Sequence, residues 1–194
     1  MASRMFTGAP GQCLNRILVY CAINPWDASY IAGFHAAMYR GASGYQILTE
    51  DGMAKITLKQ ANTIIEKAFA KAAEMKVKPL AVVVLDDAGH IVAVQRQDNA
   101  SMFRYDVALG KAWGAVAMGC SSRALAGRAK ENPNFMITLS ATAQGKFLPQ
   151  PGAVLLTDAA GNIVGSAGAS GGTGDEDEAC CAFGAEQAGL KAVI

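Results

Sequence analysis

Three cationic side chains in the middle of the chain, Arg96, Arg104 and Lys111, have types suited to holding an acidic ligand. Arg104 and Lys111 are about two helical turns apart, a rise of about 10 Å, so both would project from one stripe. Such groups form strong hydrogen bonds with carboxylates, and Lys111 could serve as a base if desolvation lowered its pKa. A solvent-facing stripe paired with Asp98 or Asp106 is the alternative. The apolar neighbours of Lys111 place that lysine near a core or an interface.

A lone histidine, His90, follows the turn glycine of a predicted hairpin, where an imidazole could ligate iron or transfer protons. The hairpin is repeated later in the chain, with Gly89 aligned on Gly161 and His90 aligned on Asn162. The asparagine favours a structural interpretation, in which the position needs a polar residue that tolerates a turn.

A glycine-rich corner formed by Ser170, Gly171 and Gly172 comes shortly before a helix predicted to begin near Gly174. Backbone N–H groups at such a corner point toward whatever binds there. The corner lacks the strand–helix–strand context of a dinucleotide fingerprint. It is therefore a candidate ligand surface of unassigned chemistry.

The acidic start of that helix has a structural explanation. Thr173 and Glu176 form a capping box, and carboxylates in the first turn complement the helix dipole. Asp175 and Glu178 could bind a hard cation weakly, but they lack the oxygen ligands of a calcium loop.

Composition and motifs exclude several classes of function. The formal net charge of +1 gives no attraction to nucleic acid or anionic membranes. The apolar run Ile17–Ile23 is too short to span a bilayer, and the five cysteines fit neither a zinc ribbon nor a disulfide framework. No HExxH, GxSxG, P-loop or CxxC motif occurs. We expect a cytoplasmic protein, and its alanine and glycine content favours a homo-oligomer.

The helices and strands that must position these groups are predicted only after Met53, where regular helix and strand periodicity begins. The order helix, hairpin, helices, hairpin, helix predicts an α+β fold with a mainly antiparallel sheet, because such short turns cannot join parallel strands. The predicted elements are a helix from Leu58 capped by Thr57 and Gln60, strands Leu80–Leu85 and Ile91–Val94, a helix Met102–Met118 capped by Ser101, a short helix from Ser121 or Ser122 to before Pro133, an irregular site-lining segment Glu131–Gly152, a second hairpin from Val154, and a helix Gly174–Lys191.

Residues 1–52 differ from the remainder because they show no sustained period of 3.6 or 2. We interpret them as an N-terminal extension and residues 53–194 as the functional domain. The extension is either an arm that embraces a neighbouring subunit or an upstream segment included by the choice of start codon.

The segments Leu80–Asp98, the helix around Lys111 and Ala112, and Gly165–Gly171 followed by Asp177 resemble the GlcG/HbpS-like proteins. The resemblance covers the chain from Met53 to its end. It implies a profilin-like fold of α/β/α layers with a five-stranded antiparallel sheet, assembled into a homo-oligomer such as an octamer. Members include haem-binding and haem-degrading sensors, the C-terminal domain of corrinoid adenosyltransferases, and proteins encoded beside glycolate or diol catabolism.

The resemblance implies haem or tetrapyrrole binding as the function. Arg96, Arg104 and Lys111 would hold the propionates, Ser170, Gly171 and Gly172 would line the pocket, and His90 is the candidate iron ligand. Hydroxyl ligation by Thr138 or Thr142 is a weaker alternative.

Two other functions remain open. A cofactor-independent lyase or isomerase would use Lys111 as base or Schiff-base amine, Arg96 or Arg104 as carboxylate clamp, and N–H groups at Ser170–Gly172 to stabilise an enolate. A non-catalytic accessory oligomer would use none of these groups.

Overall fold

The computed structural model describes residues 38–41, 44–47 and 55–194. The chain forms two compact units, Met1–Thr49 and Glu50–Ile194. The first contains an antiparallel hairpin of β1 (Met38–Gly41) and β2 (Gly44–Ile47), which the sequence analysis did not predict. The remainder of the predicted extension, residues 1–37, 42–43 and 48–52, lies outside the described residues.

The second unit is built on a five-stranded antiparallel sheet, as predicted. Its strands lie in the order β4-β3-β6-β5-β7, so β4 and β7 form the edges. The bounds are β3 (Ala81–Asp86), β4 (Ile91–Arg96), β5 (Ala153–Thr157), β6 (Ile163–Ser170) and β7 (Lys191–Val193).

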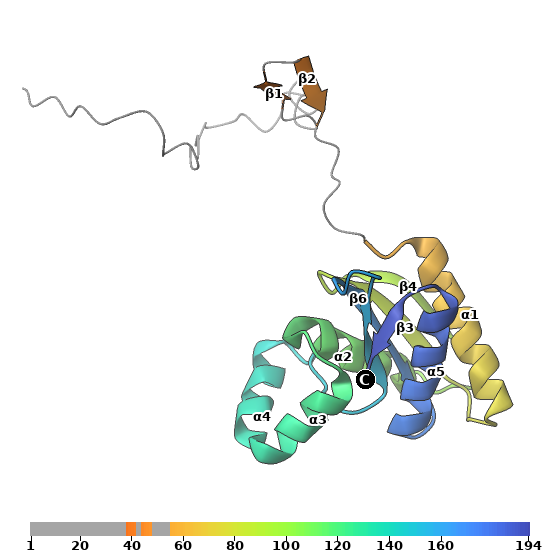
Figure 1. The fold of residues 1–194 in the computed structure, drawn as a ribbon. Helices are drawn as coiled ribbons and strands as arrows, with labels where there is room; N and C mark the ends of the chain where they lie inside the picture. Colours follow the sequence, from red (N-terminus) through yellow and green to blue (C-terminus); the bar gives the residue numbers. More distant parts are fainter. Residues whose placement is uncertain (1–37, 42–43, 48–54) are drawn as a thin grey trace, which may run out of the picture. The chain divides into compact units, whose positions relative to one another are not determined.

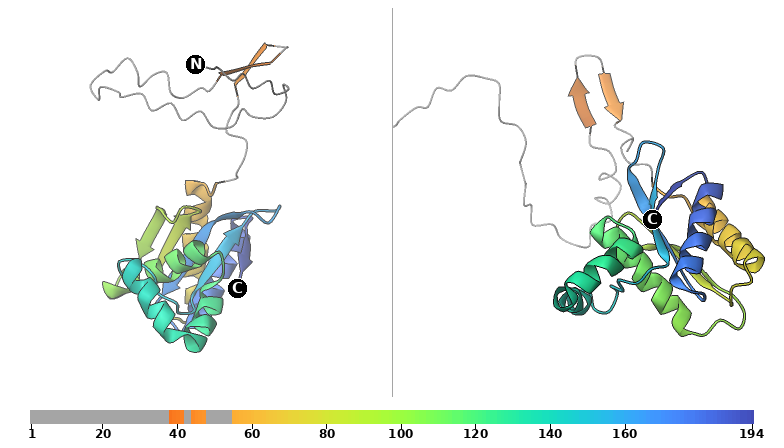
Figure 2. Two further views of the ribbon diagram at one scale, coloured as in Figure 1. Left: turned by 90° about the vertical axis from the view of Figure 1, so that its left-hand side faces the viewer. Right: turned by 60° about the horizontal axis from the view of Figure 1, so that its bottom comes forward.

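Helices cover both faces of this sheet and give the α/β/α layers expected (Figure 1). One face packs against α1 (Leu58–Glu74) and α5 (Gly174–Gln187) around a large apolar cluster. The other packs against α2 (Phe103–Met118), with Val83 and Leu85 meeting Ala108 and Ala112. Beside α2 lie α3 (Ser122–Glu131) and α4 (Pro133–Thr142), as Figure 2 shows from two further sides. Because β3 is buried throughout most of its length, its continuous apolar run is explained by cover on both faces.

The helix starts follow the capping signals in all but one case. Thr57 with Gln60 and Thr173 with Glu176 form the expected capping boxes, and the Ser121 hydroxyl accepts from Ala124 N–H. The predicted cap Ser101 is wrong, because α2 begins after Met102 without a side-chain cap.

Three expected boundaries differ from the structure. The segment predicted to be irregular contains α4, because Asn132 caps the helix and Pro133 occupies its first turn, where a missing N–H costs nothing. The last helix ends at Gln187, and the residues after Gly189 return as the edge strand β7. The first helix ends at Glu74, before the expected Lys78–Pro79 stop.

The repeated hairpins have one design. In the first, the Asp86 carboxylate accepts N–H bonds from Ala88 and His90, and Gly89 has a φ of 80°. In the second, Asp158 accepts from Asn162 N–H, and a glycine with a φ of 89° closes the turn. This shared geometry explains why His90 and Asn162 align: each is held by an aspartate at the start of its turn.

Candidate functional site

The glycine corner, Ser170 to Gly172, lies where β6 ends and leads to α5. Asp177 in the first turns of α5 fixes it, because Asp177 Oδ1 accepts the Gly172 N–H at 2.9 Å. This N–H is therefore engaged within the protein and does not point freely at a ligand, as the sequence had suggested.

Lys111 completes the same network from α2. Its Nζ donates to Asp177 Oδ2 at 2.9 Å and to Ala169 O at 3.1 Å. The side chains of Lys111 and Asp177 are only 7% and 1% exposed, so the ion pair is closed to solvent. A Cβ added at Gly152 would lie 2.5 Å from Lys111 Nζ, which shows how tightly the lysine is packed.

This placement favours a structural role for Lys111. The lysine joins α2, β6 and α5 and, through Asp177, holds the glycine corner in shape. A base or Schiff-base amine would have to leave this pair before it met a substrate.

The two arginines, by contrast, face a common region. Arg104 Nη1 lies 3.4 Å from Ser170 Oγ. Ala81 on β3 is paired with Ser170 on β6 and with Arg96 on β4. Ser170 and Arg96 therefore project from the same face of the sheet, two strand spacings or about 10 Å apart. Arg96 also donates to Ala100 O.

A pocket of about 350 Å³ opens at the glycine corner. We call it the glycine-corner pocket; its lining includes Lys76, Lys78, Arg104, Gly171 and Gly172. Glu176 also contributes, but its Oε2 accepts the Thr173 N–H and hydroxyl in the capping box. The pocket thus gathers three cationic side chains around backbone that leads into a helix N-terminus, an environment suited to an anion.

Lys76 and Lys78 are the members of this pocket that the sequence analysis missed. They lie in the connection between α1 and β3, where the pattern was interpreted only as a helix stop. The sequence signal available for a cationic site was the presence of two lysines within Lys76–Pro79. In the structure, Lys76 adopts a left-handed φ of 58° in this connection. Only the fold shows that this connection lies beside the glycine corner.

The candidate iron ligands lie elsewhere. His90 is the only histidine among the described residues, and its side chain is 80% exposed, with Nδ1 3.5 Å from Asp86 Oδ2. Along the chain it is six residue steps, about 20 Å in extended conformation, from Arg96 at the other end of β4. Thr138 and Thr142 lie on exposed positions of α4, where their hydroxyls donate to carbonyls one turn earlier.

The acidic cluster is engaged in ion pairs across to α3. Arg123 Nε donates to Glu178 Oε1 at 2.9 Å, and Arg123 Nη2 pairs with Asp175. Hydrogen bonds with Asp175, then Glu178, raise the pKa of Arg123 above its usual range. Within residues 55–194 no group of three His, Cys, Asp or Glu side chains is arranged to hold a metal ion.

Comparison with known proteins places these features in context. Residues 56–186 match the family described as haem degrading protein HbpS-like. An uncharacterised 15.0 kDa protein of Citrobacter freundii, from the dhaT–dhaS intergenic region, is 29% identical over 127 residues, which cover 64% of this chain and 86% of that protein.

Several solved structures share this fold, and one of them is a haem complex. A PduOC:haem complex aligns with a TM-score of 0.65 and 22% identity, over 73% of this chain and 100% of that one. The ORFY protein of Klebsiella pneumoniae gives 0.64 and 22%, over 74% and 97%. HbpS gives 0.60 and 26%, over 76% and 96%.

None of the helices in the described part of the chain has the length and apolar character that a bilayer crossing requires.

Proposed function

Because the chain belongs to the HbpS-like family, we propose that it binds haem or a related tetrapyrrole, with the propionates held at the glycine-corner pocket. The observation that carries the proposal is the convergence of Arg104, Lys76 and Lys78 on one pocket beside Ser170. Charge-assisted hydrogen bonds to carboxylates are the strongest that such a surface can make.

The pocket suits the acidic arms of a ligand whose body lies outside it. Its volume of about 350 Å³ is at the lower end of the range for small-molecule sites, about 300–1,000 Å³. Arg96 lies at the end of β4, across β3 from Ser170, and supplies a further cation for a second carboxylate.

An apolar surface for the body of the ligand adjoins these cations. Val94 on β4 is paired with Val83, so it faces the α2 side of the sheet, as Arg96 does. It is nevertheless 40% exposed, because α2 packs over β3, β6 and β5 and leaves the edge strand β4 uncovered. At the start of α2, Met102 and Phe103 are also exposed. A flat apolar ring system with acidic arms matches this combination.

Bound haem would supply an iron centre for ligand binding or redox chemistry. Among the residues of this chain, Arg104, Lys76, Lys78 and Arg96 hold and orient the acidic arms, and the Lys111–Asp177 pair keeps the glycine corner in shape. The carboxylate-binding part of the site therefore fits haem. His90 is too distant to ligate the same haem within one protomer, so we assign it to a haem held by a neighbouring copy in a homo-oligomer.

The wider assignment follows the same reasoning. We propose residues 53–194 as the functional domain, a cytoplasmic location, and a link to the catabolism of small organic acids or diols. The link to catabolism is supported by the Citrobacter freundii relative, which comes from the dhaT–dhaS intergenic region. The lyase or isomerase alternative gains no support, since Lys111 and the Gly172 N–H are both engaged within the protein.

A haemin titration followed at the Soret band tests the proposal, on the full chain and on a version that starts at Met53. We expect a saturable, stoichiometric shift in both, and an affinity lowered about tenfold by Arg104→Gln, because a charge-assisted hydrogen bond is lost. Arg128→Gln on α3 is the control for loss of an arginine charge, since this arginine is exposed and lies outside the pocket. His90→Ala should change the Soret position, because an iron ligand is lost. Absence of any shift in the wild-type protein would overturn the proposal.

A further inference from the structure

A second groove also borders the α1–β3 connection, and Val77 contributes to both this groove and the glycine-corner pocket. We call it the α1–β4 groove; it has a volume of about 530 Å³, and its lining includes Phe69, Val77, Pro79, Gln95, Gln97 and Asp98. This volume is within the range of small-molecule sites, about 300–1,000 Å³. The haem proposal makes no use of these side chains.

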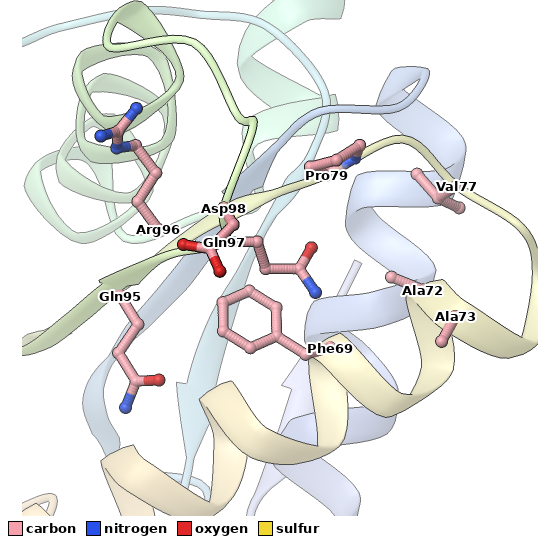
Figure 3. A pocket seen from close by; sticks show the side chains of 9 residues that line it. All are labelled: Phe69, Ala72, Ala73, Val77, Pro79, Gln95, Arg96, Gln97 and Asp98. Atoms are coloured by element: carbon pink, nitrogen blue, oxygen red, sulfur yellow. The ribbon is translucent and has the colours of Figure 1, made fainter.

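Polar groups in the groove gather around one aromatic ring. Figure 3 shows the side chains of Gln95, Gln97 and Asp98 around the ring of Phe69, with Val77 and Pro79 beyond. The Oε1 atom of Gln97 accepts the Leu80 N–H at 2.8 Å, which fixes the amide and leaves its Nε2 as a donor. An orientated donor and an aromatic face are thus already in place.

The charge of the groove is negative at its centre. The Asp98 carboxylate has no hydrogen bond or ion pair with another residue of the described part of the chain. Arg96 also borders the groove, but its register with Ala81 turns its side chain to the α2 face, where it donates to Ala100 O. Lys71, on the same helix as Phe69, pairs with Glu74. Asp98 is therefore the charged group that a ligand in the groove would meet.

We propose that the α1–β4 groove binds a small organic cation. The ammonium group would lie between the Asp98 carboxylate and the face of Phe69, where ion pairing and the cation–π attraction act together. An apolar or aromatic body would pack on Val77 and Pro79, and a hydroxyl or carbonyl oxygen would accept from Gln97 Nε2. Because both Asp98 and the groove are open to solvent, the affinity is millimolar.

Tyramine is a suitable probe, because it carries an aromatic ring, an ammonium group and a hydroxyl. Its counterpart 4-hydroxyphenylacetate has the same ring and hydroxyl with the opposite charge. In amide NMR titrations of the full chain, tyramine should give saturable shifts at Phe69, Gln97 and Asp98, while the carboxylate should give none there.

Asp98→Asn separates charge recognition from the shape of the groove. We expect it to weaken tyramine binding about fivefold, the effect of one exposed ion pair, and to leave the fold unchanged because the side chain is exposed. Asp106→Asn, at an exposed carboxylate on α2, should leave tyramine binding unchanged. The proposal is overturned if tyramine causes no saturable shift, if the carboxylate binds equally well, or if Asp98→Asn binds tyramine like the wild type.

Discussion

Replacing Lys111 with methionine should be among the most destabilising single changes in the domain. The substitution keeps the length of the side chain but removes the ammonium from Asp177, whose carboxylate is 1% exposed and would keep only the Gly172 N–H. An uncompensated buried charge of this kind costs about 3–5 kcal/mol. Since the whole domain is expected to be stable by about 5–15 kcal/mol, the variant would lose a large share of its free energy of unfolding.

The double variant Lys111→Met/Asp177→Asn tests the cause of that loss. It removes both charges, yet the amide oxygen introduced at position 177 can still accept the Gly172 N–H. We expect a total cost of about 1–2 kcal/mol, smaller than that of the single lysine variant, because no unpaired charge remains buried.

Urea unfolding at neutral pH, with linear extrapolation to water, measures both quantities. In thermal unfolding the single variant should lose on the order of 10 °C. The reasoning is refuted if Lys111→Met costs less than about 1 kcal/mol, as expected of an exposed pair, or if the double variant is less stable than the single one. The first result would mean that Lys111 is accessible, which the base hypothesis requires, and the second would mean that an unpaired buried charge is not the cause of the loss.

Two further predictions concern packing and the buried thiols. Gly184→Ala should cost about 1–3 kcal/mol in urea unfolding, because the added Cβ would lie 2.4 Å from a carbonyl oxygen of α1. Gly127→Ala, which meets nothing within 4 Å in the interior of α3, should instead stabilise the protein by up to about 1 kcal/mol. If both substitutions had the same effect, close helix packing would not be the reason for Gly184. Burial raises the pKa of the Cys180 thiol to about 11, and burial also raises the pKa of the Cys181 thiol well above the 9.0 of an ordinary thiol. The folded state therefore keeps protons that the unfolded state loses, so the free energy of unfolding should fall as pH rises from 9 toward 11. Urea midpoints across this range should decline less steeply in Cys180→Ala/Cys181→Ala, and an unchanged slope would contradict the assignment.

Most of the fold could be predicted because its signals are local. Capping boxes at Thr57 and Thr173, the apolar run that became β3, and the repeated aspartate–glycine turns each act within a few residues. Short turns then require antiparallel pairing, which leaves few arrangements of the sheet. The helix α4 was missed because prolines were interpreted as breaks, although proline after a capping asparagine is a helix start.

The site was harder to predict because it depends on contacts between distant segments. Lys111 was correctly placed near a core, but nothing in its neighbourhood indicates that Asp177 neutralises it. Arg104 and Ser170 were both chosen, and the structure brings them together across 66 positions of sequence. The local sequence around Lys76 and Lys78 shows only two cations close together, and it is the packing of α1 against the sheet that places them at the pocket.

The central claim, that the glycine-corner pocket holds the acidic arms of a tetrapyrrole, is tested most directly by comparing haemin with its dimethyl ester. The ester keeps the ring and the iron but removes both negative charges. Soret titrations of the wild-type protein should show haemin bound at least tenfold more tightly than the ester. In Arg104→Gln that preference should shrink, because the two changes remove the same interaction. Equal affinities for haemin and its ester, or a preference unaffected by Arg104→Gln, would contradict the account.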